Sequence, residues 1–116
     1  MTDNSTVTAD RRDGLAVIYT RGYINNQAGE EIARVAYSLI DEGHKALLLN
    51  LEGTTIVNSI GISILIEIIE KMIEIGGRLA FCRLTPTIDK TFHIMGLTQY
   101  APIYGDEATA VAALRG

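Results

Sequence analysis

The segment Asn58-Ser59-Ile60-Gly61 contains the side chain best placed for chemistry in this sequence. It stands where a predicted loop meets a strongly apolar helix. The first N–H groups of a helix lack intrahelical partners and lie at the positive end of its dipole. A phosphate on the Ser59 hydroxyl would carry about −1.5 to −2 charge and would be stabilised at that position. The pattern favours a binding surface that phosphorylation switches, rather than an active site.

The same position allows a simpler role for Ser59. Serine is one of the preferred residues for capping a helix N-terminus, and Asn58 can fill that role as well. The two roles are compatible, because a helix N-terminus stabilises a phosphate as readily as it binds an unmodified hydroxyl. The local pattern alone makes capping the more frequent function of such a serine.

The apolar helix is predicted over Ile60–Ile75. Its polar residues fall on one narrow stripe at about 3.6 residues per turn; they are Ser63, Glu67, Glu70, Lys71 and Glu74. Glu67 and Lys71 have the i,i+4 spacing of a favourable ion pair. Ile60 projects onto the same stripe, so it is predicted to be exposed beside Ser59, either as an isolated surface isoleucine or as a partner contact.

Other polar residues near this segment are candidate contacts. Thr54 and Thr55 are predicted to lie in the loop before Ser59, where hydroxyls serve as secondary acceptors or, more often, satisfy backbone groups. Ser63 lies one turn after Ser59 and is predicted to be solvated or at the rim of a contact. Asn25 and Asn26 open the first helix, where capping is their ordinary role.

No catalytic, metal or cofactor site is predicted. Neither His44 nor His93 is expected to belong to a metal site, and Cys82 is the only cysteine. Cys82 falls in a predicted strand and is expected to be a small buried hydrophobe. The sequence contains no phosphate-binding glycine loop, nucleophile elbow or paired carboxylates, so we do not expect an enzyme.

Hydrophobic periodicity predicts an α/β fold with the element order ββαβαβαβα. The predicted strands are Ser5–Ala9, Leu15–Thr20, Ala46–Leu51, Leu79–Arg83 and Pro102–Tyr104. The predicted helices run from about Asn26 to Glu42, from Ile60 to Ile75, from Pro86 to Gly96, and from Asp106 to about Leu114. Ile88, Phe92 and Met95 are predicted to form the buried stripe of the third helix. Strands separated by helices favour a mostly parallel sheet, with an antiparallel hairpin at its start and helices packed on it.

The length and charge of the chain exclude several further classes of function. The 116 residues fit one domain, predicted to span residues 1–116, with enough length for a hydrophobic core. The net charge of −4 comes without a basic stripe, so nucleic-acid binding is not expected. Residues 1–10 are too polar for a signal peptide, and Ile60–Ile75 is too short and too charged to cross a bilayer. We expect a cytoplasmic protein that does not insert into membranes.

The order of elements, together with three short motifs, resembles the STAS domain, and more narrowly the small anti-sigma-factor antagonists. These motifs are Gly22-Tyr23-Ile24-Asn25, Leu48-Leu49-Asn50-Leu51 and Asn58-Ser59-Ile60-Gly61. The resemblance covers almost the whole chain, and the order and spacing of the motifs are more specific than any one of them. It implies the STAS fold.

The resemblance also implies a regulatory cycle. The unphosphorylated antagonist binds an anti-sigma factor, usually a serine kinase, and thereby releases the sigma factor. The kinase then phosphorylates a serine in an Asp-Ser-x-Gly motif, which corresponds to Ser59, and a serine phosphatase reverses the reaction. The implied partner-contact residues surround this acceptor; they are Asn25, Thr54, Thr55, Val57, Asn58, Ile60, Gly61 and Ser63. Asn25 and Asn58 stand where the family pattern has acidic residues, so two negative charges are missing near the acceptor.

The sequence also bears on two other kinds of function for an α/β domain. A STAS accessory subunit of a lipid-transport ATPase, or a scaffold component of a stress-signalling complex, would use the same fold, and the sequence does not exclude either. A response-regulator receiver would need an aspartate at the end of the third strand, where this chain has Asn50. The receiver is therefore excluded.

Overall fold

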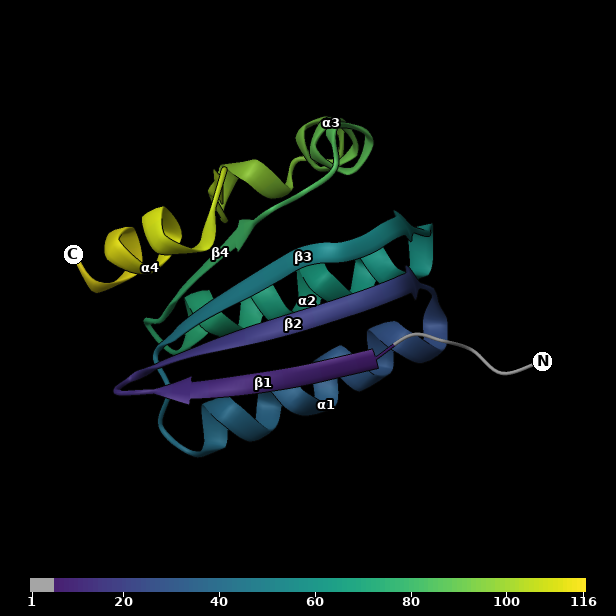
Figure 1. Cartoon of the computed structure of the whole chain (residues 1–116). Helices are drawn as coiled ribbons and strands as arrows, with labels where there is room; N and C mark the ends of the chain where they lie inside the picture. The colour runs from purple at the N-terminus through teal and green to yellow at the C-terminus, as the bar shows by residue number, and fades with distance from the viewer. Residues whose placement is uncertain (1–5) are drawn as a thin grey trace.

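A five-stranded sheet forms the centre of the molecule in the computed structural model, which describes residues 6–116 (Figure 1). The spatial order of the strands follows the sequence: β1 (Thr6–Arg12), β2 (Leu15–Ile24), β3 (Ala46–Val57), β4 (Arg78–Cys82) and β5 (Ile103–Tyr104). β1 pairs antiparallel with β2, and the remaining neighbours are parallel. The predicted α/β class and hairpin are confirmed; Ser5, the predicted start of the first strand, lies outside the described residues.

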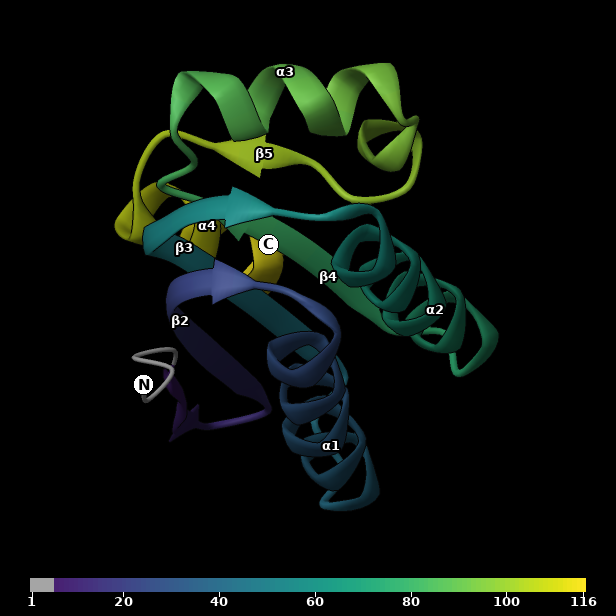
Figure 2. The ribbon, with the colours of Figure 1, turned by 90° about the vertical axis from the view of Figure 1, so that its right-hand side faces the viewer.

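Helices connect the parallel strands, as the predicted order requires, and one further helix follows the last strand. They are α1 (Asn26–Asp41), α2 (Ser59–Glu74), α3 (Pro86–Ile94) and α4 (Glu107–Arg115), with a short 3-10 helix, η1 (Leu97–Gln99), after α3. α1 and α2 lie side by side on one face of the sheet, and α4 lies on the other face (Figure 2). Among the described residues, no helix combines the length and apolar character needed to cross a membrane.

The central strand β3 explains how the two faces are filled. Successive strand residues point to opposite faces, so Leu47, Leu49 and Leu51 join the core under α1 and α2. Leu48 points the other way, into the smaller core under α4. This double burial accounts for the continuous apolar run in the sequence.

Strands β2 and β3 are both longer than predicted. β3 continues to Val57, and its second half pairs with β2 from Arg21 to Ile24, with two irregularities in register. Thr54 and Thr55 therefore lie within a strand and not in a loop; Thr55 is exposed, and the side chain of Thr54 is fully buried. The hydroxyl of Thr54 forms a hydrogen bond with that of Thr20, which is also buried. This pairing satisfies two hydroxyls inside the sheet.

Two predictions about helix side chains are wrong. Met95 is 51% exposed, because α3 ends at Ile94 and Met95 is the C-cap rather than part of the buried stripe. The other two members of that stripe are buried, and Phe92 packs against Phe81 with ring centroids 5.0 Å apart. On α2, the ammonium of Lys71 lies 3.9 Å from the carboxylate of Glu74 instead of pairing with Glu67.

Cys82 is buried at the end of β4, as predicted, with 0% of its surface exposed. Burial in apolar surroundings disfavours the thiolate and raises the pKa of Cys82 to about 12. The residue belongs to the core between the sheet and α4. Its function in the fold is packing.

Candidate functional site

The segment around Ser59 lies at the edge of the sheet where β2 and β3 end together. Ile24 and Val57, the last residues of these parallel strands, are partners in register. The chain then enters α1 after Asn25 and α2 after Asn58, so the two helices begin beside each other. The N–H of Asn58 donates to the carbonyl of Ile24, 3.0 Å away, and ties the two strand ends together.

Both helices are capped by asparagine. The side-chain oxygen of Asn25 accepts a hydrogen bond from the N–H of Ala28 at 2.9 Å. The side-chain oxygen of Asn58 accepts one from the N–H of Gly61 at 2.7 Å. Asn58 is therefore the cap of α2, and Ser59 is its first helical residue. Of the two capping roles that the sequence left open, the structure assigns this one to Asn58.

Because Asn58 is the cap, the hydroxyl of Ser59 is available for another role. Ser59 is exposed to solvent. Among the groups of residues 6–116, only the Ser63 hydroxyl bonds to this residue from a side chain, and it donates to the Ser59 carbonyl at 3.1 Å. Ser59 is thus an exposed residue at the helix N-terminus, where an anion would meet favourable dipole and N–H interactions.

A close approach of glycines holds the two helix starts together. A Cβ atom on Gly29 of α1 would lie 3.5 Å from the Cα of Gly61 and 2.8 Å from the end of the Ile64 side chain. A Cβ atom on Gly61 would lie only 2.7 Å from the backbone oxygen of Ile24. Gly61 is therefore required because α2 begins in direct contact with the end of β2.

Exposed apolar side chains lie on the residue after Ser59 and near the ends of β2 and β3. Ile60 is 51% exposed, which confirms the prediction from helical spacing. Tyr23 and Ile56 are 41% and 55% exposed, and they are cross-strand partners whose side chains lie on the same face of the sheet. The exposure of these two residues was not predicted from the sequence. Both lie in segments predicted to be loops, where strand alternation could not indicate which way their side chains point.

The predicted contact residues divide into two groups. Six of them are exposed or half-buried; they are Asn25, Thr55, Val57, Asn58, Ile60 and Ser63. The other two, Gly61 and Thr54, are buried. Gly61 is required for packing, and Thr54 is held inside the sheet by Thr20.

Comparison with known proteins identifies the family. A family model described as the STAS domain matches residues 6–110. The chain belongs to the STAS domain family. This assignment agrees with the observed architecture, a mixed sheet with one antiparallel strand at its edge and two helices on one face.

Several proteins resemble this STAS domain over nearly its whole length. BtrV of Bordetella bronchiseptica, which is assigned as an anti-sigma factor antagonist, is 23% identical over 109 residues, covering 94% of each chain. The crystal structure of an anti-sigma factor antagonist from Mycobacterium paratuberculosis has a TM-score of 0.87 at 22% identity, covering 100% of this chain and 98% of that one. The Bacillus cell-fate determinant SpoIIAA in its phosphorylated form has a TM-score of 0.74 at 20% identity, covering 93% and 98%.

Proposed function

We propose that this STAS domain, comprising residues 1–116, is an anti-sigma-factor antagonist that phosphorylation of Ser59 switches off. The unphosphorylated protein binds an anti-sigma factor with serine kinase activity and so releases the sigma factor. The kinase transfers the γ-phosphoryl group of ATP to the hydroxyl oxygen of Ser59, and a serine phosphatase removes it. The observation that carries this proposal is the exposed Ser59 hydroxyl at the first position of α2.

The surroundings of Ser59 support a switch based on charge. The exposed apolar side chains of Tyr23, Ile56 and Ile60 provide a surface that a partner can dehydrate. A phosphate added to such an interface places an anion of about −1.5 to −2 charge against apolar groups. Removing an unpaired charge from water costs several kcal/mol, compared with about −8 kcal/mol for a micromolar complex. One phosphate is therefore sufficient to dissolve the complex without a conformational change.

The names of similar proteins also support an anti-sigma-factor antagonist controlled by phosphorylation. All three similar proteins are named as anti-sigma factor antagonists, and SpoIIAA exists in a phosphorylated form. Within the part of the chain that the structure describes, no cluster of three or more histidine, cysteine or acidic residues is arranged to hold a metal ion. In this proposal the protein acts by binding alone.

The proposal is tested by incubating the purified protein with ATP and each kinase-type anti-sigma factor of its own genome. Intact-mass spectrometry should show the gain of one phosphate in the wild-type protein. The Ser59→Ala variant should gain none, whereas Ser63→Ala, which removes the neighbouring hydroxyl one turn away, should still be phosphorylated. Phosphate on Ser59→Ala, or none on the wild type with any of these kinases, would refute the assignment of Ser59.

A further inference from the structure

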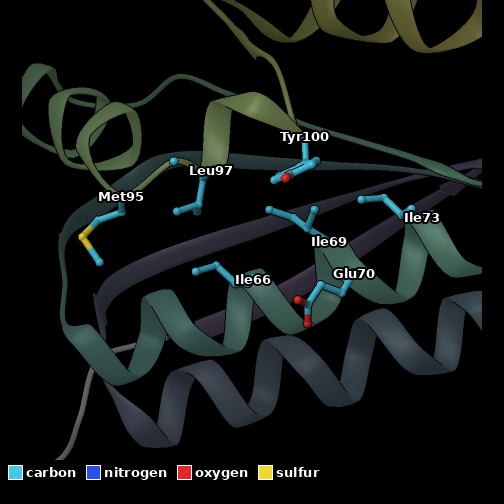
Figure 3. Close-up of a pocket in the computed structure, with 8 residues that line it drawn as sticks. Ile66, Ile69, Glu70, Ile73, Met95, Leu97 and Tyr100 are labelled. Atoms are coloured by element: carbon cyan, nitrogen blue, oxygen red, sulfur yellow. The ribbon is translucent and has the colours of Figure 1, made fainter.

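A second exposed apolar region lies farther along α2. A hollow of about 320 Å³ separates α2 from the turn that joins α3 to η1. Ile66, Ile69 and Ile73 of α2 face Met95, Leu97 and Tyr100 across it (Figure 3). We refer to this hollow as the α2–η1 groove. It is partly open to solvent.

Three large apolar side chains in the walls of the groove are more than half exposed to solvent. Ile73 is 53% exposed, Met95 51% and Tyr100 63%. Tyrosine and methionine are enriched at protein interfaces, because they offer a large contact area and adapt to the shape of a partner. A contiguous apolar surface of this kind marks a site of association more often than an isolated exposed side chain does.

One carboxylate gives the groove a charge preference. Glu70 borders the groove and is exposed (Figure 3). Among the residues that the structure describes, no cation lies within ion-pair distance of its carboxylate, whereas Glu74 on the same helix lies 3.9 Å from Lys71. An occupant with a lysine or arginine among apolar side chains would match this arrangement.

The groove lies on the same side of α2 as Ser59. At about 3.6 residues per turn, Ser59, Ile66, Glu70 and Ile73 fall within a sector of roughly 60° on the helix. A rise of 1.5 Å per residue places Ser59 and Ile73 roughly 21 Å apart along that face. A partner seated over Ser59 can therefore extend along α2 into the groove, and the length corresponds to about four turns of a partner helix.

We propose that the α2–η1 groove receives an amphipathic helix of the anti-sigma factor. Apolar side chains of that helix, spaced at i, i+3, i+4 and i+7, occupy the groove, and one lysine or arginine pairs with Glu70. This inference rests on the proposed function, since it assigns a second contact surface to the same partner. The groove provides affinity that does not depend on the charge state of Ser59.

The test measures the binding of the purified anti-sigma factor to charge variants by isothermal titration calorimetry. Glu70→Lys should weaken binding about tenfold or more, because it places like charges opposite each other. Glu74→Lys is the matched control, since it makes the same change in charge on the same helix outside the groove. It should alter the affinity by less than about threefold.

A second pair of variants tests the apolar contact. Ile73→Ser should weaken binding about fivefold or more, because truncating a contact residue removes buried apolar area. Ile94→Ser is its control, since Ile94 is 71% exposed on α3 and does not line the groove. It should leave the affinity unchanged. Thermal unfolding of all four variants verifies that the fold is intact.

The possible outcomes separate this inference from the proposed function. If Ser59→Asp abolishes binding while Glu70→Lys and Ile73→Ser bind like the wild type, the groove is not a contact surface and the inference is wrong. If no anti-sigma factor binds the wild-type protein, both proposals fail. If wild-type protein self-associates in sedimentation experiments and Ile73→Ser abolishes that association, the occupant is a second copy and the inference is overturned.

Discussion

Helices α1 and α2 begin in the same way at neighbouring positions of one sheet edge, yet only α2 begins with a hydroxyl. Each follows a parallel strand, and each is capped by an asparagine that accepts a hydrogen bond from the third helical N–H. The first helical residue is Asn26 in α1 and Ser59 in α2. The cap provides the helix geometry and the first residue provides the chemistry. In α2, Asn58 caps the helix and Ser59 carries the hydroxyl, so either residue can be substituted while the other is kept.

The largest expected difference between the two helix starts concerns negative charge and partner binding. Ser59→Asp should weaken binding to the anti-sigma factor roughly 100-fold or more, because a carboxylate buried without a counter-ion costs several kcal/mol. Asn26→Asp introduces the same charge at the start of α1 and should change the affinity by less than about threefold. Calorimetric titration measures both. Equal affinities of Ser59→Asp and Ser59→Ala would contradict the charge mechanism.

The next difference concerns the glycines where the helices meet. Gly61→Ala should lower the free energy of unfolding by about 2 kcal/mol, because its Cβ would meet the backbone oxygen of Ile24, which cannot move aside. Gly29→Ala should cost less than about 1 kcal/mol, because its Cβ would meet the flexible end of the Ile64 side chain. Urea denaturation measures both variants. Equal losses would show that the two contacts do not differ in this way.

The two asparagine caps, Asn25 and Asn58, should contribute equally to the stability of the fold. Asn25→Ala and Asn58→Ala should each lower the free energy of unfolding by about 1 kcal/mol, because each removes the acceptor of one helix N–H. Ser59→Ala removes an exposed hydroxyl that does not cap the helix, so it should change stability by less than about 0.5 kcal/mol. A loss in Ser59→Ala as large as that in Asn58→Ala would mean that the serine shares the cap.

The smallest expected effect comes from restoring the acidic residues of the family pattern. Asn25→Asp and Asn58→Asp should each raise the free energy of unfolding at neutral pH by about 0.3–1 kcal/mol, because a carboxylate is stabilised at a helix N-terminus. That interaction lowers the pKa of the introduced aspartate in the folded state. The gain should therefore be present above the ordinary aspartate pKa of about 3.9 and be lost as the pH falls through the lowered value. Denaturation at neutral and at acid pH checks it.

The order of elements was predictable because local signals mark nearly every boundary. Asp106 and Thr85 cap α4 and α3 as their residue types suggest, accepting hydrogen bonds from Thr109 and Ile88. The continuous apolar run in β3 identified a strand buried on both faces. The exposure of Ile60 followed from helical spacing alone, because the direction of a side chain on a helix depends only on its position.

The remaining features depend on contacts between segments distant in the sequence. The second half of β3 contains polar residues and a glycine that are typical of a loop, and it is a strand only because β2 pairs with it. Thr54 is buried because Thr20, on the neighbouring strand, provides its hydrogen-bond partner. The contact between Gly29 and Gly61 likewise appears only when α1 and α2 are placed side by side. Periodicity within one segment carries no information about such partners.

The inaccessible thiol of Cys82 offers a practical advantage for studying this protein. Alkylating reagents attack the thiolate, and this thiol is both covered by the fold and reluctant to ionise. The sequence contains no other cysteine. A cysteine introduced at position 74 or 94, outside the proposed contact surfaces, would thus be the single residue that a maleimide dye labels in the native state. Fluorescence from each of the two positions could then follow the arrival of a partner in real time, on an otherwise unaltered background.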